Sequence, residues 1–518
     1  MQQVIEKLET SQQEVIAFLL NPQSYGYNNV PVTRIDTHIS VVFLVGDRAY
    51  KMKRAVRYAY LDYSTIGCRK NFCEAEVSLN RRTAPMLYRD IVPVTRENDG
   101  SLQLGGRGEP VEWLVEMARF DQSALFDRMA MDGHLTANLL TRLADEIAAF
   151  HASAEPVTGV MASDTMRSIV RGNDFEFIER VPATFDFERV ERLKYQTYRA
   201  LDDSTTLLDA RARRGFVRRC HGDLHLRNIC LIDGRPVLFD GIEFSDAFSV
   251  IDVLYDLAFL LMDLEHRGHR DDANLVFNRY MAMSGDLDGL EAIPLFLSCR
   301  AAVRAKTTAA AADAQADPET VNRLNLEARD YLDLACDVLE PQPPSLIAIG
   351  GLSGSGKSSL AQVLAPLIGR APGAVILRSD VTRKRLFGVA PETSLDASAY
   401  TTLQSERVYR HQLESAAAAL AAGHSAIVDA VFARGEERAA IEAVAQGAGA
   451  RAHCLWLDAP AETLQARVTG RTCDASDADA EVVRQQLTYD LGEMDWQRVP
   501  AGGGPGQTLS IARGIVGA

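Results

Sequence analysis

The residues Gly351-Leu352-Ser353-Gly354-Ser355-Gly356-Lys357-Ser358-Ser359 decide the fold of the C-terminal part of the chain. They match the pattern G-x-x-x-x-G-K-[ST]. In this pattern glycines let backbone N–H groups wrap phosphate oxygens, the lysine contacts the β- and γ-phosphates, and the hydroxyl binds Mg²⁺. An apolar run at 346–349 precedes the stretch and a helical pattern at 358–367 follows it, which is the strand–loop–helix context that the motif requires. The predicted nucleotide-binding residues are Gly351, Ser353, Gly354, Ser355, Gly356, Lys357, Ser358 and Ser359.

The sequence beyond this loop alternates short apolar runs with helical patterns. Candidate strands lie at 374–377, 426–428 and 453–457, and a helical pattern covers 409–422. Such alternation predicts a parallel sheet flanked by helices. The glycine-rich stretch 501–506 is predicted to be a turn or loop.

Acidic residues follow two of these strands, where a ligand on a parallel sheet is expected. Asp380 would lie beside the γ-phosphate, where an acceptor hydroxyl loses its proton, although an N-cap is an alternative role. Asp429 is a candidate acid for Mg²⁺. Arg383 could hold an anionic acceptor group or stabilise transferred charge. Arg467 and Arg471, four residues apart, could form a lid over the phosphates or a solvated helix face.

On these residues, the stretch 346–500 resembles the P-loop kinases that include polynucleotide 5′-kinase, zeta-type toxins, gluconate kinase and antibiotic-phosphorylating enzymes. The resemblance rests on the phosphate loop, the Asp380-x-x-Arg383 spacing, the Asp429 strand and the arginine-bearing lid. It implies that Asp380 is the catalytic base and that Arg383 assists it. It leaves the acceptor open.

A second group of motifs lies in the N-terminal part. Cys220-His221-Gly222-Asp223-Leu224-His225-Leu226-Arg227-Asn228 contains H-G-D-x-x-x-x-N, and Asp240 follows a predicted hairpin. This spacing is typical of kinase-like phosphoryl transfer, with Asp223 as base and with Asn228 and Asp240 as Mg²⁺ ligands. A zinc site of His221, Asp223 and His225, at alternate positions of a strand, is the alternative.

A kinase also needs a lysine on an early strand and a glutamate on the next helix. Apolar segments at 40–45 and 48–53, separated by Gly46-Asp47, predict a hairpin. Lys51 and Lys53 share one face of its second strand, so both are candidates, with Lys51 slightly favoured. A helix expected at 73–87 offers Glu74 and Glu76, of which Glu76, at the start of Glu76-Val77-Ser78-Leu79, is favoured.

Residues 35–335 resemble the aminoglycoside phosphotransferase family of the protein-kinase-like fold, mainly through the H-G-D motif and Asp240. The order of expected strands and helices, mostly helical from Ala137 onward, fits the small β-rich lobe and larger helical lobe of that fold. The resemblance implies structural roles for the acids of 251–258. One departure is that Thr37-His38-Ile39-Ser40 stands where a glycine-rich loop is expected. Both halves together resemble bacterial bifunctional proteins with a phosphotransferase-like half and an ATP-binding half. The arginines preceding Asp223 either line an anionic-acceptor site or lie on a solvated helix; they are Arg211, Arg213, Arg214, Arg218 and Arg219.

Length and composition set the limits of this interpretation. The chain has 518 residues, 47 % of them hydrophobic, so more than one domain is expected. We predict a kinase-like domain at 1–340, a proline-rich linker at 341–345 and a P-loop kinase domain at 346–518. The fold class is α/β with α+β. Lys and Arg number 55 against 70 Asp and Glu, and the net charge of −15 counts against general nucleic-acid binding.

The sequence therefore predicts an enzyme, an ATP- and Mg²⁺-dependent phosphotransferase acting on a hydroxyl-bearing acceptor. A small molecule or a 5′-hydroxyl nucleic-acid end would both fit. The alternative is a P-loop kinase regulated by a non-catalytic, kinase-shaped sensor domain. No apolar run is long enough to span a membrane, eight cysteines lack a C-x-x-C pair, and no standard signal sequence is seen. A cytoplasmic location is expected, whereas the oligomeric state stays open.

Overall fold

The computed structural model describes residues 12–58, 61–470 and 475–517. Within them the chain forms two compact units. The first unit comprises Met1–Thr165, Asp209–Leu260 and Thr308–Leu324. The second comprises Met166–Leu208, Leu261–Thr307 and Asn325–Ala518. No helix in the described ranges is both long enough and apolar enough to cross a bilayer.

The first unit is built on a six-stranded sheet with the order β1-β2-β3-β8-β6-β7. Every neighbouring pair is antiparallel. Its strands are β1 (Thr33–Asp36), β2 (Ser40–Val45), β3 (Arg48–Lys53), β6 (Tyr88–Arg96), β7 (Leu102–Leu104) and β8 (Glu109–Ala118). The predicted hairpin is confirmed at both ends, because its alternating apolar residues and its Gly46-Asp47 turn fix the register.

Helices cover both faces of this sheet. Helix α2 (Ile66–Asn80) places Cys73 and Val77 in a core with Val115, whereas a helical segment at 12–19 packs Val15 against the opposite face. The helix expected at 73–87 begins and ends earlier in the structure, as α2. Thr65 caps α2 by accepting from the Cys68 N–H, and a turn replaces the helix after Asn80.

The remaining elements of the first 340 residues are divided between the two units. Short strands are β4 (Arg57–Tyr58), β5 (Leu61–Asp62), β9 (Val217–Arg219), β10 (Ile229–Ile232), β11 (Arg235–Leu238) and β12 (Val250–Asp252). Helices of the middle of the chain are α3 (Phe126–Met131), α4 (Ala137–Ser153), α5 (Ala162–Ile178), α6 (Phe187–Arg213), α7 (Asp246–Ser249), α8 (Val253–His266), α9 (Arg270–Ser284), α10 (Ile293–Asp313) and α11 (Pro318–Asp337). The small β-rich part followed by a helical part is the kinase-like arrangement expected from the sequence.

The second unit contains a five-stranded sheet of order β14-β15-β13-β16-β17, in which every pair is parallel. The strands are β13 (Ser345–Gly350), β14 (Val375–Arg378), β15 (Ala426–Asp429), β16 (Arg451–Asp458) and β17 (Gln497–Pro500). Helices α12 (Lys357–Leu364) and α18 (Pro505–Val516) pack apolar residues against it, among them Leu364 and Val516. The parallel sheet predicted around the phosphate loop is therefore present, flanked by helices.

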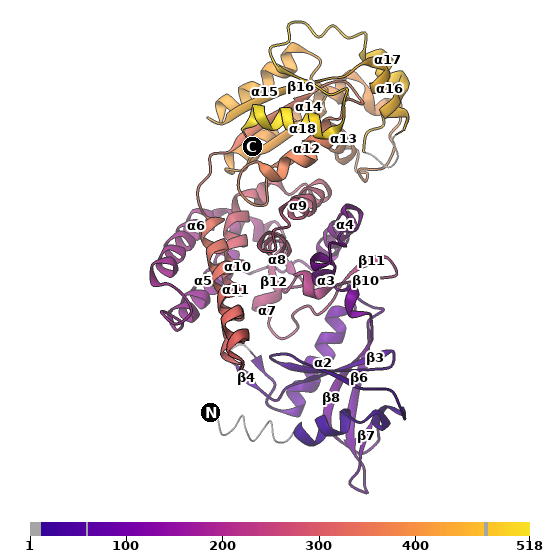
Figure 1. Cartoon of the computed structure of the whole chain (residues 1–518), viewed down its shortest axis with the longest axis vertical. Helices are drawn as coiled ribbons and strands as arrows, with labels where there is room; N and C mark the ends of the chain where they lie inside the picture. The colour runs from indigo at the N-terminus through magenta and orange to yellow at the C-terminus, as the bar shows by residue number, and fades with distance from the viewer. Residues whose placement is uncertain (1–11, 59–60, 471–474, 518) are drawn as a thin grey trace. The chain divides into compact units, whose positions relative to one another are not determined.

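Other helices complete this P-loop part (Figure 1). They are α13 (Ser379–Leu386), α14 (Thr402–Ala421), α15 (Gly435–Gly447), α16 (Ala461–Thr469) and α17 (Ala480–Gln486). Two sequence expectations are corrected. Helix α14 begins before the expected 409, because Thr401 caps it by accepting from the Gln404 N–H. The expected loop at 501–506 is shorter, because Pro505 opens α18 from the first helical turn.

Candidate functional site

The H-G-D segment lies between β9 and a 3₁₀ turn at Leu226–Asn228, and it presents Asp223. Asn228 Nδ2 donates to Asp223 Oδ2 over 2.8 Å and to the Asp223 carbonyl over 3.0 Å. The His225 ring accepts the Arg227 N–H at Nδ1, so its Nε2–H faces Asp223 Oδ2 at 3.3 Å. The Asp223 carboxylate is about one-third exposed (35 %). It is thus oriented by two neighbours and still accessible to an acceptor.

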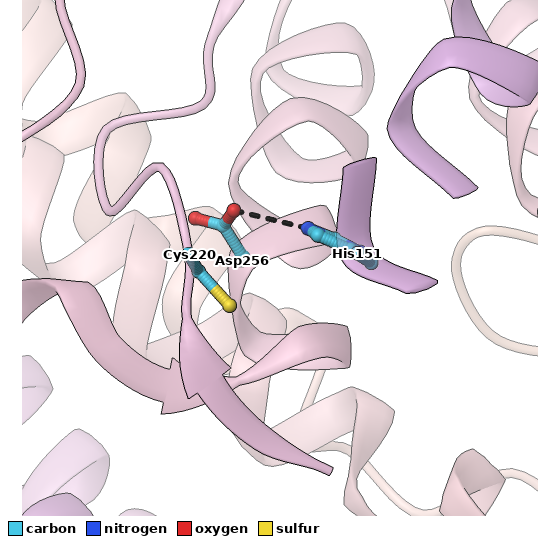
Figure 2. Close-up of side chains that lie close together, drawn as sticks. All are labelled: His151, Cys220 and Asp256. Carbon is cyan, nitrogen blue, oxygen red and sulfur yellow. Dashed lines mark hydrogen bonds and ion pairs between the residues drawn. The ribbon is translucent and has the colours of Figure 1, made fainter. Parts of the chain in front are cut away.

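The buried carboxylate of Asp256, on α8, holds the H-G-D segment in place. Asp256 accepts the N–H groups of His221 and Gly222 over 3.0 and 2.8 Å, and it lies 3.1 Å from His151 Nε2 (Figure 2). Cys220 lies beside this pair, and the three ligand atoms fall within 4.8 Å of one another. The Asp256 oxygens already serve backbone donors, so we interpret the cluster as support for the loop rather than as a metal centre. The family resemblance implied such a structural role.

Gly222 and His221 are fixed by the same packing. Gly222 has a φ of +84°, and a Cβ there would lie 2.7 Å from the Phe248 carbonyl oxygen. The His221 ring donates from Nε2 to the Phe239 carbonyl and accepts the Asp223 N–H at Nδ1. Burial lowers the pKa of His221, which favours this neutral ring. The ring nitrogens that the zinc alternative would need are therefore engaged in hydrogen bonds.

The early lysine, the helix glutamate and the second aspartate converge as the kinase interpretation requires. Lys51 Nζ lies 2.8 Å from Glu76 Oε1 and 2.5 Å from Asp240 Oδ1. Burial opposes the charge on Lys51, but Asp240 and Glu76 outweigh it and raise its pKa well above the ordinary value. The Asp240 N–H donates a hydrogen bond to the Tyr88 hydroxyl, which helps to fix the position of Asp240. Glu74 is exposed beside Lys70, so Glu76 is the glutamate that points inward.

Lys53 occupies a different environment from Lys51. Its side chain is 1 % exposed and its Nζ contacts Glu76 Oε2 at 2.7 Å, Glu243 Oε1 at 2.5 Å and the Tyr63 hydroxyl at 3.2 Å. The two lysines together lower the pKa of Glu76 to about 2 against the opposing effect of burial. Sequence reasoning missed Glu243 and Tyr63, because nothing local in either stretch reports a contact with β3.

The turn between β1 and β2 replaces a glycine-rich loop. Thr37 Oγ1 accepts the Ser40 N–H over 3.0 Å, and Arg54 Nε donates to the Thr37 carbonyl over 3.1 Å. The His38 ring stacks on Tyr58 with 4.7 Å between ring centroids. The turn is thus held by side chains rather than opened by glycine.

Three of the five arginines that precede Asp223 make contacts within the fold, whereas Arg213 and Arg214 are exposed at the end of α6. Arg211 is buried and pairs with Asp252 through two hydrogen bonds of 2.7 and 2.9 Å. Arg218 donates to the carbonyls of His151, Ala152 and Ala154, whereas Arg219 pairs with Asp246. These three side chains fit neither an acceptor-binding surface nor a freely solvated face.

In the P-loop part, the motif residues adopt a compact arrangement. Lys357 Nζ donates to the carbonyls of Gly351 and Leu352 over 2.8 and 3.1 Å. Ser358 Oγ donates to Asp429 Oδ2 over 2.6 Å, which joins the loop to the end of β15. The hydroxyl and the carboxylate expected to serve Mg²⁺ therefore face each other.

The loop itself fits a phosphate group. Gly354 has a φ of +83°, and a Cβ there would lie 2.5 Å from the Leu464 carbonyl oxygen, so only glycine is accommodated. The Ser355 hydroxyl is buried and has no hydrogen-bond partner within the described residues, which suits an incoming oxygen. Gln486 on α17 accepts the Ser353 N–H, a contact that the sequence did not indicate. Ser359 follows Ser358 in α12.

Asp380 lies in the first turn of α13, after β14, while Arg378 occupies the N-cap position. Burial raises the pKa of the Asp380 carboxyl; Arg378 opposes this shift and Asp429 adds to it. Arg383 is buried, donates to the Ala399 carbonyl over 2.6 Å and lies over the Tyr400 ring. Its guanidinium therefore contacts the 397–400 segment rather than the phosphate loop.

The predicted lid arginines are only partly described. Arg467 donates to the carbonyls of Ala501 and Gly503 over 2.8 and 3.0 Å and reaches the Gly354 carbonyl at 3.5 Å. Helix α16 ends at Thr469, and Arg471 lies outside the described residues.

Comparison with protein families gives two matches. Residues 106–292 match the model of the phosphotransferase enzyme family, and residues 346–489 match a model described as an AAA domain. The first range contains Asp223, Asn228 and Asp240, and the second contains the phosphate loop and Asp380.

Similar whole chains and solved structures are also known. An uncharacterized protein of Mycobacterium tuberculosis strain H37Rv is 28 % identical over 492 residues, covering 93 % of this chain and 95 % of its own length. Plasmodium vivax ethanolamine kinase is 13 % identical over 61 % of this chain and 86 % of that chain, with a TM-score of 0.37. Mycobacterium tuberculosis APS kinase CysC, solved with AMPPNP and APS, is 19 % identical over 34 % and 100 %, respectively, with a TM-score of 0.25.

Proposed function

We propose that this phosphotransferase, which joins an aminoglycoside phosphotransferase-like part to a P-loop kinase part, has two Mg-ATP sites. Each site would transfer the γ-phosphate of ATP to an acceptor hydroxyl. The observation that carries the proposal is the contact of Lys51 with Glu76 and Asp240, together with the contact of Asn228 with Asp223. The two groups are joined where Phe239, next to Asp240, donates its N–H to the Asn228 carbonyl over 3.0 Å. These residues come from segments far apart in the sequence, yet they form the set that phosphoryl transfer needs.

In the first site, Asp223 would accept the proton of the acceptor hydroxyl. Asn228 and His225 hold its carboxylate, so the base is oriented before the acceptor arrives. Asn228 and Asp240 would hold Mg²⁺, which when bound neutralises charge on the phosphates. Lys51 would exchange its contact with Asp240 for one with phosphate oxygens and keep Glu76 as its anchor.

In the second site, the loop at 351–359 would bind the phosphates through its backbone N–H groups and Lys357. Ser358 and Asp429, already in contact, would hold Mg²⁺. Asp380 would take the acceptor proton, and its raised pKa suits a general base better than an ordinary aspartate. Arg383 would keep the 397–400 segment in place beside it, and Arg467 would hold the phosphate loop against the 501–503 segment.

The test is transfer of label from γ-labelled ATP by the full chain. Sugars, nucleosides, aminoglycosides and 5′-hydroxyl oligonucleotides would be offered as acceptors. Asp223→Ala should remove one activity and Lys357→Ala the other. A double variant that transfers phosphate as well as the natural chain would overturn the proposal. Labelling of oligonucleotides alone would assign the nucleic-acid end, which the net charge of −15 does not favour.

A second candidate is a regulatory first unit that binds a ligand without transferring phosphate. The glycine-free turn at Thr37–Ser40 favours it, because this turn stands where a phosphate-covering loop is expected. Titration of the Lys357→Ala chain with Mg-ATP separates the two: tight binding with turnover excludes a pure sensor. We also propose a cytoplasmic location, supported by the absence of disulfides among the seven cysteines of the described residues.

A further inference from the structure

The first site contains one more lysine than a kinase needs. Strand alternation puts Lys51 and Lys53 on the same face of β3, where three carboxylates meet them: Glu76, Asp240 and Glu243. Each Glu76 oxygen takes one lysine, Oε1 facing Lys51 and Oε2 facing Lys53. The remaining carboxylates are divided, Asp240 going to Lys51 and Glu243 to Lys53.

The two lysines differ in access to a ligand. The Lys51 side chain is 13 % exposed and its partner Asp240 is 41 % exposed, so this pair borders open space. Lys53 and its partners Glu76 and Glu243 are all at least 95 % buried. Tyr63 closes the remaining side, with its ring 4.9 Å from Lys53 Nζ and its hydroxyl donating to Glu243. Gln12 also fixes the strand there through the Lys53 carbonyl and the Ala55 N–H.

We propose that Lys53 is a positioning residue that holds Glu76 and Glu243 in place, whichever ligand Lys51 contacts. The inference rests on the proposed function of the first site. When Asp240 takes Mg²⁺ and Lys51 takes phosphate, Lys53 keeps both oxygens of Glu76 engaged. Glu243 follows Asp240 by three residues, so the same lysine anchors the far end of the metal-binding loop.

Charge explains why the anchor must be a cation. A buried carboxylate without a partner is costly, and removal of one member of a buried ion pair leaves that cost with the other. Without Lys53, one oxygen of Glu76 and the Glu243 carboxylate would be buried without a cation, so Glu76 and the loop that carries Asp240 would lose their fixed positions. Asn80 contributes a neutral anchor at the middle of the loop by accepting the Gly241 N–H over 2.7 Å.

The experiment uses the full chain carrying Lys357→Ala, so that nucleotide turnover reports only the first site. Hydrolysis of γ-labelled ATP without acceptor is compared for Lys53→Met, Lys53→Arg, Lys51→Met, Glu243→Gln and the Lys53→Met/Glu243→Gln pair. Lys53→Met should lower kcat about tenfold with KM for ATP changed less than about twofold, because it acts through Glu76 and the loop. The added Glu243→Gln should restore kcat about threefold or more, since it removes the unpaired acid. Lys53→Arg should retain more activity than Lys53→Met.

Lys51→Met supplies the contrast, because loss of a phosphate contact should raise KM for ATP. If Lys53→Met raises KM as Lys51→Met does, and Glu243→Gln gives no recovery, Lys53 binds phosphate and the inference is wrong. If Lys53→Met does not fold, Glu243→Gln decides: a lower kcat at unchanged KM supports the inference and a wild-type kcat overturns it. A Lys357→Ala chain that binds no ATP would instead overturn the proposed function, and the inference with it.

Discussion

The burial of the Asp380 carboxyl predicts how turnover at the P-loop site depends on pH. Burial raises its pKa, so the ionised base is present only above a pKa higher than that of an ordinary aspartate. In a chain carrying Asp223→Ala, turnover at the P-loop site should therefore fall on acidification at a higher pH than an exposed aspartate would give. A pH–rate profile measures this acid limb. Asp380→Asn should abolish it, and a profile unchanged by that variant would show that another group is the base.

The raised pKa of Asp380 also predicts how the stability of the fold depends on pH. A carboxyl with a raised pKa in the folded state favours folding when protonated, and this contribution is lost as the pH rises through the folded pKa. Asp380→Asn keeps the shape and removes the charge, so its melting temperature at neutral pH should equal or exceed that of the natural chain. Thermal unfolding at pH 5 and pH 8 checks the direction. If Asp380→Asn melts at a clearly lower temperature than the natural chain at pH 8, the prediction from the buried carboxylate is contradicted.

Gly222 offers a third prediction for a single residue. Gly222→Ala combines a φ of +84° with a Cβ 2.7 Å from the Phe248 carbonyl oxygen. Gly234→Ala is a matched control, because Gly234 has a φ of +73° but no atom within 4 Å of such a Cβ. Both should lose about 1 kcal/mol from backbone strain, and Gly222→Ala should lose clearly more and disable the first site. Denaturant unfolding and ATP turnover in the Lys357→Ala background measure the difference, and equal losses would contradict it.

Among the secondary-structure elements, those with strong local signals could be predicted from the sequence. The β2–β3 hairpin and the strand–loop–helix around Lys357 follow from alternation, turn residues and glycine spacing. The sequence places helix α2 too far along the chain, because the apolar pattern continues into the turn after Asn80. The start of the helix depends on the Thr65 cap. The Lys53 contacts could not be predicted, because Glu243 lies 190 residues along the chain and only the tertiary fold brings it to β3.

Helix α9 covers the edge strand β14 of the parallel sheet, and this element yields its own prediction. Asn278 donates to the Ala374 carbonyl over 3.1 Å and accepts the Ile376 N–H over 2.7 Å, as a neighbouring strand would. Asn278→Ala should lower the free energy of unfolding by about 1–3 kcal/mol, since it leaves the Ile376 N–H without its acceptor, while the Ala374 carbonyl keeps Asn274 as a donor. Met283→Ala, at an exposed position of the same helix, is the control and should change little. Calorimetry compares them, and an equal effect would contradict a role for the side-chain amide.

For the whole molecule, these contacts bear on where the chain can be divided. The sequence predicts a boundary at 341–345, yet α9 lies in the same compact unit as the parallel sheet. Asn274 donates to the Pro372 and Ala374 carbonyls, and Arg270 donates to the Pro366 and Gly369 carbonyls. A fragment that begins at residue 346 lacks all of these donors. Its β14 edge would then offer unpaired groups to other molecules.

The fragment 346–518 should therefore aggregate more readily and melt at a lower temperature than the P-loop part does in the full chain. Light scattering and thermal unfolding measure both effects, with bound Mg-ATP as a check that the fragment is folded. Asn278→Ala in the full chain should move in the same direction by a smaller amount, because Arg270 and Asn274 still cover the edge. If the fragment is monomeric and as stable as the full chain, α9 adds nothing to the sheet and 341–345 is a sufficient boundary. If only the fragment fails, the P-loop part needs a helix that precedes the predicted linker by about sixty residues in sequence.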